Sequence, residues 1–185
     1  MLFFVLTHNP QMWIPKLMKV FKMKIGLISD THDNIQSIQN AISLFNAKHV
    51  SFVIHAGDIV SPETVEAFTG VKLIAVLGNN DLEIDGLTNA IDRIGGQLKG
   101  EFYELTQDDL IFAIYHGTNA IRKESLIQSG KYDIVVCGHT HRMQNKKVGK
   151  TIVVNPGTAN GWFFGYSATA AVFDTKTRDS EFINL

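Results

Sequence analysis

Six short apolar runs constrain the fold of this chain more than any other feature. Each is four to six residues long, is rich in Ile, Val and Leu, and stops at Gly, Asp, Asn or His. The runs are KIGLIS before Asp30, FVIHAG before Asp58, LIAVLG before Asn79, LIFAIY before His116, IVVCG before His139 and TIVV before Asn155. A run that is apolar on both faces and ends in turn-forming residues is typical of a buried strand. The sequence therefore predicts buried strands with polar side chains at their ends.

Helical patterns separate several of these runs. Apolar residues recur at spacings of three and four from Ile35 to Phe45, which predicts an amphipathic helix over residues 34–47 with Asp33 as its cap. A second helix is expected to begin at the pair Ser61-Pro62, because the first helical position does not need the N–H that Pro lacks. A third is expected over residues 120–129 and to stop at Gly130.

Hairpin patterns are more frequent in the second half of the chain. Apolar segments flank the turn residues Asp108 and Asp109, the turn VGK at 148–150, and a polar turn between SATAAVFD and SEFINL. Strand-helix units followed by hairpins predict an α/β fold, a layered sandwich of mixed β-sheets flanked by helices. In such folds ligands gather at the carboxyl ends of the strands.

The length and composition favour one domain of ordinary size in a globular protein. The chain has 185 residues, of which 45% are hydrophobic and 19% charged, and we expect residues 23–185 to form a single domain. A formal charge of -1 argues against an extended nucleic-acid surface. The single Cys137 excludes an internal disulfide framework and suits a reducing compartment, so a cytoplasmic location is expected.

The first 22 residues differ from the rest of the chain. They combine an apolar start with two prolines and three lysines, and they lack the pattern of a signal peptide. The segment Leu2 to Leu6 is too short to span a membrane, and no membrane partner is expected. We interpret residues 1–22 as an extension, either a misread start before Met23 or a loose segment. The alternative is a surface anchor or a homo-oligomer contact through Trp13 and Ile14.

Polar donors collect at five of the strand ends. The seven candidates are Asp30, His32, Asp58, Asn79, His116, His139 and His141. Beyond a strand end, two residues separated by one other residue point to the same side if the backbone is extended. The two His of GHTH are therefore expected to face one point, and so are Asp30 and His32. Glycines beside these donors, Gly57, Gly78, Gly117 and Gly138, are expected to let the backbone approach the site closely.

The donor set suits a pair of divalent metal ions. Two ions roughly 3.5 to 4 Å apart need about eight protein contacts, and seven residues with one bridging carboxylate supply them. Because no thiolate is present, the set favours Mn, Fe, Co, Ni or Zn, with Mn as our first expectation and Mg less suited to so many His.

In this order, the motifs DTH, GD, GNND, HG and GHTH resemble those of the calcineurin-like metallophosphoesterase superfamily. The short length, MKIGLISDTH and a late NPGT resemble its small prokaryotic phosphodiesterase branch, and the resemblance covers Met23 to about Asp174. The resemblance implies that one metal is held by Asp30, His32 and His141, the other by Asn79, His116 and His139, and that Asp58 bridges them. It also implies hydrolysis of phosphoric esters by a metal-bridging hydroxide.

Two positions depart from the family pattern. Asn80 stands where many members carry a His that acts as the acid for the leaving group. Asn80 is therefore a catalytic candidate because of this position, and it is also a candidate contact for the phosphate of the substrate. Thr118 replaces the second His of the common HGH, which leaves any substrate contact there in doubt. Arg142 is a candidate phosphate contact, and a solvated loop Arg is the alternative.

Several other residues have plainer interpretations. His55 is expected to be a buried, hydrogen-bonded imidazole that at most supports Asp58. Cys137 belongs to an apolar run and is expected to be a small core residue. The aromatic segment GWFFGY at 161–166 is interpreted as core or subunit contact, with a wall for a base or aryl group as the alternative. His8 and His49 are expected on the surface.

The expected function is therefore that of a dinuclear phosphodiesterase. Two dications, two carboxylates and one hydroxide leave a single positive charge, which suits the single negative charge of a small phosphodiester substrate. The alternative from another class is a protein-binding scaffold like the retromer coat subunit of this superfamily, but such scaffolds tend to lose metal-binding His residues and all seven donors are intact here. A serine hydrolase is excluded, because no G-x-S-x-G segment exists.

Overall fold

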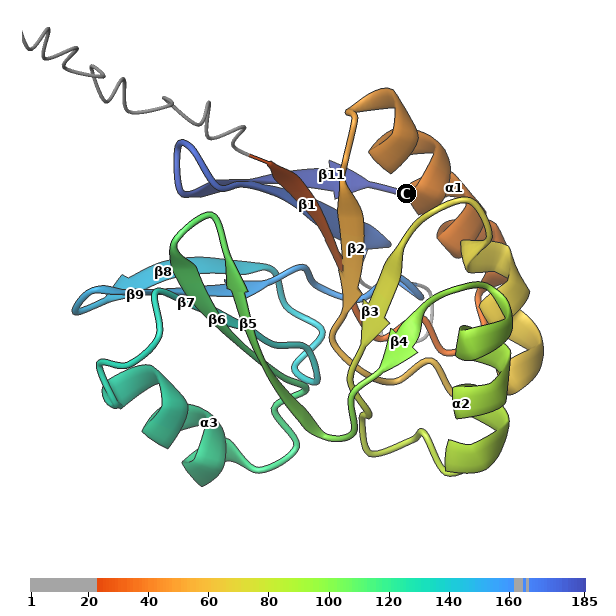
Figure 1. The fold of residues 1–185 in the computed structure, drawn as a ribbon, viewed down its shortest axis with the longest axis horizontal. Coiled ribbons are helices and arrows are strands. Elements are labelled where there is room, and N and C mark those ends of the chain that lie inside the picture. Colours follow the sequence, from red (N-terminus) through yellow and green to blue (C-terminus); the bar gives the residue numbers. More distant parts are fainter. Residues whose placement is uncertain (1–22, 162–164, 166) are drawn as a thin grey trace, which may run out of the picture.

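A computed structural model of the chain describes residues 23–161, 165 and 167–185, and in it two β-sheets pack face to face with helices on their outer sides (Figure 1). This architecture confirms the expected α/β sandwich of mixed sheets. The proposed extension at 1–22 and the aromatic side chains of segment 161–166 lie outside the described residues.

The first sheet has six strands in the order β11-β10-β1-β2-β3-β4. Their bounds are β1 Lys24–Ile28, β2 Phe52–His55, β3 Leu73–Ala75, β4 Gln97–Leu98, β10 Thr169–Asp174 and β11 Asp179–Asn184. β1 to β4 run parallel to one another, whereas β10 is antiparallel to both of its neighbours. The carboxyl ends of β1, β2 and β3 therefore lie at one edge of this sheet.

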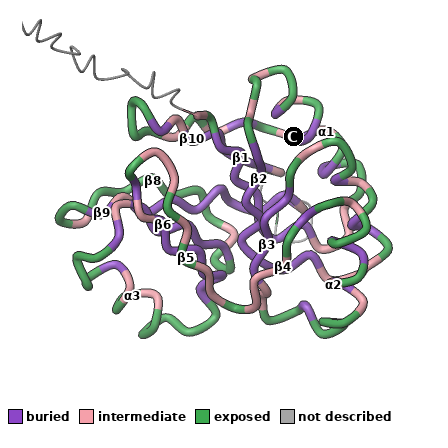
Figure 2. The backbone as a smooth tube through the Cα atoms, viewed as in Figure 1, coloured by how far each residue is buried: buried purple, intermediate pink, exposed green. Residues whose placement is uncertain are grey.

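The second sheet has five strands in the order β5-β6-β7-β9-β8. Their bounds are β5 Phe102–Gln107, β6 Leu110–Tyr115, β7 Ile134–Val136, β8 Gln144–Val148 and β9 Thr151–Asn155. The three central strands β6, β7 and β9 are parallel, and the outer pairs β5-β6 and β8-β9 are the expected hairpins. All six apolar runs of the sequence are thus strands, and Figure 2 shows their buried paths through the molecule.

Three apolar clusters hold these layers together. Between the two sheets, Ile25, Leu27, Phe112 and Phe173 are fully buried, and the rings of Phe112 and Phe173 meet edge to face. A second cluster lies between the first sheet and its helices, and a third beneath α3 on the second sheet. Strands apolar on both faces are therefore needed in both sheets, because each sheet has a buried side against the other sheet and another against helices.

The helices are α1 Ile35–Ala47, α2 Ile84–Arg93 and α3 Ala120–Gln128, with a 3-10 helix η1 over Pro62–Phe68. The expected helices over 34–47 and 120–129 and the helix start at Ser61-Pro62 are confirmed within one residue, and Gly130 has the left-handed φ of +64° past α3. α2 and the short strand β4 were not predicted.

The predicted cap of α1 is wrong. Asn34, not Asp33, caps the helix, because its side-chain oxygen accepts the Ser37 N–H at 3.1 Å. The Asp33 carboxylate instead accepts the backbone N–H and hydroxyl of Ser61 at 2.9 and 2.7 Å and the Thr64 hydroxyl at 3.2 Å. Asp33 thus ties the loop after β1 to the start of η1.

The beginning of the described chain is anchored. The Met23 backbone N–H lies 2.9 Å from an Asp108 carboxylate oxygen and 2.8 Å from the Thr175 hydroxyl oxygen. The Asp108 carboxylate also accepts the Thr175 hydroxyl at 2.6 Å. The start of β1 is therefore tied to the β5-β6 turn and to the turn after β10. None of the helices in the described part of the chain has the length and apolar character needed to cross a bilayer.

Candidate metal centre

Five loops bring the predicted donors to one place between the two sheets. The first sheet contributes Asp30 and His32 after β1, Asp58 after β2 and Asn79 after β3, and the second contributes His116 after β6 and both His139 and His141 after β7. Hydrogen bonds join neighbouring loops: Asp30 N–H donates to Gly57 O at 3.0 Å, and Gly138 N–H donates to His116 O at 2.8 Å.

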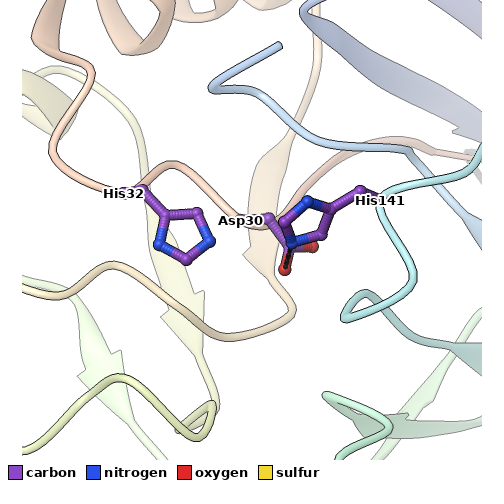
Figure 3. Close-up of side chains that lie close together, drawn as sticks. All are labelled: Asp30, His32 and His141. Atoms are coloured by element: carbon purple, nitrogen blue, oxygen red, sulfur yellow. Dashed lines mark ion pairs between the residues drawn. The ribbon is translucent and has the colours of Figure 1, made fainter. Parts of the chain in front are cut away.

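One group of donors consists of Asp30, His32 and His141, whose ligand atoms all lie within 4.8 Å of one another. Figure 3 shows His32 on the loop after β1 and the His141 ring beside the Asp30 carboxylate. His141 Nε2 is 3.1 Å from Asp30 Oδ1. Asp30 is fully buried and both imidazoles are half-buried, so a cation held here would be reached from the cavity side.

A second group consists of Asp30, Asp58 and His116, all buried. His116 Nε2 lies 3.3 Å from Asp58 Oδ2 and 4.0 Å from Asp30 Oδ1. The other ring nitrogen, Nδ1, is 2.7 Å from the carbonyl oxygen of Ala56, so Nδ1–H donates there and Nε2 faces the carboxylates. The same carboxylate oxygen of Asp58 is 3.6 Å from His32 Nε2, which places Asp58 between the two groups.

The remaining two donors, Asn79 and His139, lie beside these groups. The His139 ring meets the His116 ring at a centroid distance of 5.2 Å, and its backbone N–H donates to the Asp30 carboxylate. Asn79 Oδ1 accepts the Thr118 hydroxyl at 3.4 Å. Asn79 and His139, with His32, Asp58, Asn80, Lys123, His141 and Arg142, line one cavity of about 810 Å³.

The residues present fit a bound divalent cation. Among the described residues, His32 Nε2 and His116 Nε2 are buried side-chain nitrogens that lack a hydrogen-bond partner. A buried polar atom without a partner is costly, so it is retained where another ligand satisfies it. Both nitrogens face Asp58, and the donors are imidazole, carboxylate and amide, which suit a divalent ion.

The backbone at these donors differs from the extended form expected from the sequence. Asp30, His32, Asp58, His139 and His141 all have φ between +40° and +67°. This left-handed conformation is uncommon for residues other than Gly and costs free energy at each position. The pairs still converge, because tight turns rather than extended segments direct their side chains toward the site.

Three of the four predicted glycines are needed for close approach, whereas a Cβ on Gly117 would meet nothing nearer than 3.5 Å. A Cβ on Gly57 would lie 2.7 Å from His116 Nδ1. A Cβ on Gly78 would lie 2.1 Å from Asp58 Oδ1, and one on Gly138 would lie 2.6 Å from Asp30 Oδ2. Distances below 3 Å are not tolerated, so any side chain at either position would displace a carboxylate of the site.

Asp81, which the sequence analysis missed, supports the centre from behind. It is 4% exposed and its carboxylate accepts three backbone N–H groups: Asp58 at 2.9 Å, Gly78 at 2.7 Å and Val60 at 2.8 Å. Asp81 thereby joins the turn that carries Asp58 to the turn that carries Asn79. The signal was present as a carboxylate directly after the GNN turn.

Asn80 contacts Asp58 rather than projecting freely into the cavity. Its backbone N–H donates to Asp58 Oδ1 at 2.9 Å, and its amide Nδ2 donates to Oδ2 at 2.8 Å. On the other side, Ser29 Oγ lies 2.6 Å from Asp30 Oδ2. Each of the two carboxylates is thus oriented by a neighbouring polar side chain.

The charged groups perturb one another. Burial favours the neutral form of Asp58, but His116 and the hydrogen bonds from Asn80 hold the pKa of Asp58 well below its usual range. Burial also opposes the charging of His116, yet Asp58 and Asp30 raise its pKa. Burial and the neighbouring His116 lower the pKa of His139. Asp58 therefore stays ionised, as a carboxylate ligand of a cation must be.

The plainer interpretations of His55 and Cys137 are confirmed. His55 is fully buried, its Nδ1 accepts the Gly57 N–H at 3.2 Å, and Nε2 lies 3.1 Å from the Thr31 hydroxyl. Burial lowers the pKa of His55 to about 4. Cys137 is buried under α3, and burial raises the pKa of its thiol to about 11. His49 is exposed, whereas His8 lies outside the described residues.

Comparison with known proteins gives the lineage of this fold and site. A sequence model of the calcineurin-like phosphoesterase superfamily domain matches residues 23–178. The chain belongs to this superfamily. Its membership confirms the resemblance seen in the sequence and the expected enzyme class, a metal-dependent hydrolase of phosphoric esters.

Three relatives show how far the similarity extends. A curated phosphodiesterase of Methanocaldococcus jannaschii is 38% identical over 160 residues, which is 85% of this chain and 96% of the relative. A solved structure described as a novel archaeal phosphodiesterase superposes with a TM-score of 0.83 at 38% identity, covering 88% of this chain and all of that one. Vps29 of Chaetomium thermophilum shares the fold alone: it is 14% identical, with a TM-score of 0.66, over 87% of this chain and 95% of its own.

Proposed function

We propose that this protein is a dinuclear phosphodiesterase that hydrolyses a P–O ester bond of a small phosphodiester. The observation that carries the proposal is a pair of buried imidazole nitrogens, His32 Nε2 and His116 Nε2, that lack a hydrogen bond and face Asp58. Asp58 itself lines a cavity together with further donors. The archaeal phosphodiesterase at 38% identity supports the substrate class. We likewise propose that residues 23–185 form the catalytic domain, residues 1–22 an extension, and the cytoplasm its location.

We assign Asp30, His32 and His141 to one ion and Asn79, His116 and His139 to the other, with Asp58 between them. The 3.1 Å contact between His141 and Asp30 supports the first set, and the adjoining rings of His116 and His139 support the second. Two divalent ions bound there would lower the pKa of a water that attacks phosphorus and neutralise charge on the phosphoryl oxygens. Imidazole and oxygen donors favour Mn, with Ni, Co, Fe or Zn as alternatives.

The chain's own residues orient this centre. Asp81 fixes the backbone on both sides of Asp58, and Asn80 holds both Asp58 oxygens. An amide cannot release a proton near neutral pH, so Asn80 is not an acid for the leaving group. We assign its second amide hydrogen, and the guanidinium of the cavity-lining Arg142, to phosphoryl oxygens of the substrate.

The test is a screen of mono- and diesters after reconstitution with Mn, Ni, Co, Zn and Mg. Diester hydrolysis that requires added metal and disappears in Asp58→Asn supports the proposal. Activity on monoesters alone, or on no ester with any metal, would contradict it.

The scaffold alternative makes a different prediction. A protein-binding domain would tolerate loss of the ligands, yet all seven donors are retained, and five of them, His32, Asp58, Asn79, His139 and His141, line one cavity. This retention favours an enzyme.

A further inference from the structure

Lys123 lines the same cavity as the candidate metal ligands, although no sequence motif points to it. It lies on α3, the helix that follows the His116 loop, so its backbone is positioned by the second sheet. Asn119 caps this helix by accepting the Arg122 N–H at 3.0 Å, and the Lys123 N–H donates to Asn119 O at 3.0 Å. The first turn of α3, and Lys123 with it, is therefore well anchored beside the cavity.

The side chain of Lys123 runs across Gly117 toward the centre. Its Cδ lies 3.5 Å from the position that a Cβ on Gly117 would take, and the Cβ of His139 lies 3.6 Å from the same point. Gly117 directly follows His116, so the Lys123 stem lies beside the loop that carries His116 and near the Cβ of His139. The residue is half-buried, which is typical of a lysine whose stem packs on the protein while its ammonium reaches water or a ligand.

Two cations near Lys123 on the chain have acidic partners outside the cavity. Arg122 pairs with Glu101 at 3.3 Å and stacks over the Tyr115 ring at 4.9 Å. Lys131, past the end of α3, pairs with Glu104. Within the part of the chain that the structure describes, the Lys123 ammonium forms no ion pair with a carboxylate. A lysine at a ligand cavity without an acidic partner is suited to an anionic ligand.

We propose that the Lys123 ammonium binds a non-bridging phosphoryl oxygen of the substrate, and of the phosphate product, on the His139 side of the cavity. This inference rests on the proposed function and deepens it, because it names the residue that recognises the anion alongside the metal ions. Lys123 contributes a compact positive charge whose ammonium donates hydrogen bonds to the anion.

The experiment compares Lys123→Gln with Lys123→Arg and with the control Lys131→Gln, which removes an equal charge outside the cavity. In metal-loaded protein, calorimetry measures binding of inorganic phosphate, kinetics give KM and kcat for bis(4-nitrophenyl) phosphate, and elemental analysis gives metal content. Loss of one charge-assisted hydrogen bond at a half-buried site should weaken phosphate binding and raise KM about tenfold. Metal content and melting temperature should stay at wild-type values, and Lys123→Arg should recover most of the affinity.

Unchanged phosphate affinity in Lys123→Gln, an equal loss in Lys131→Gln, or loss of metal from Lys123→Gln would each overturn the inference. A wild-type protein that binds phosphate through Lys123 but hydrolyses no diester would overturn the proposed function and leave this inference standing. The two failures are thus distinguishable.

Discussion

Replacing Asp81 tests whether a carboxylate behind the centre holds its two central turns. In Asp81→Ala, the N–H groups of Asp58, Val60 and Gly78 all lose their acceptor. The first of these bonds is buried and the other two are partly buried, so we place each loss near the lower end of the range for an unsatisfied donor. The sum is about 3 kcal/mol of unfolding free energy. For a domain of this size that corresponds to a fall in melting temperature of roughly 6 to 12 °C.

The assay is thermal unfolding followed by circular dichroism in the presence of a chelator, so that metal binding does not contribute to stability. Asp81→Asn retains one acceptor oxygen and should lose less than Asp81→Ala. The control is Asp92→Asn, which removes a carboxylate from the exposed face of α2 and should change the unfolding free energy by no more than about 0.5 kcal/mol. An Asp81→Ala melting temperature within about 2 °C of wild type, below the shift worked out above, would refute the reasoning.

Three further predictions concern the leaving group, the extension and the pH. Because Asn80 cannot supply a proton, aryl diesters should be hydrolysed much faster than alkyl ones. Asn80→His should raise alkyl turnover about tenfold while changing aryl turnover little. The measurement is the slope of rate against the pKa of the leaving group, and a slope that is shallow in wild type and unchanged in the variant would contradict this. Removal of residues 1–22 should leave melting temperature and turnover unchanged, since β1 begins at Lys24 and Met23 is anchored by Asp108 and Thr175, and a large drop in either would show that the extension completes the domain. The pKa of His55 is about 4 in the folded state, below its unfolded value of 6.5. Between these values the unfolded state binds more protons, so the unfolding free energy should fall by up to about 3 kcal/mol as pH falls from 6.5 to 4. His55→Gln should flatten that part of the curve of metal-free unfolding free energy against pH. Parallel curves for the two proteins would contradict the assignment.

The strand framework and the donor set could be read from the sequence because both depend on local composition. Runs such as LIFAIY become strands wherever they are buried, and polar residues that follow parallel strands meet at one edge by topology alone. The conformation of those residues could not be read in the same way. The left-handed φ of Asp30 and His139 depends on bonds to loops far along the chain, such as the His139 N–H to the Asp30 carboxylate.

Other differences have similar causes. The choice between Asp33 and Asn34 as the cap of α1 depends on Ser61 and Thr64, which engage Asp33 from another loop. α2 was within reach of pattern reading, because its buried Leu87, Ala90 and Ile91 have helical spacing. β4 has only two residues and exists through its pairing with β3, which no local pattern predicts.

The most direct test of the central claim is anomalous diffraction from crystals of the protein grown with Mn²⁺. The account predicts two anomalous peaks roughly 3.5 to 4 Å apart on either side of the Asp58 carboxylate. One peak should be contacted by Asp30, His32 and His141 and the other by Asn79, His116 and His139. A single peak, or two peaks that leave His116 and His139 without a metal contact, would contradict it.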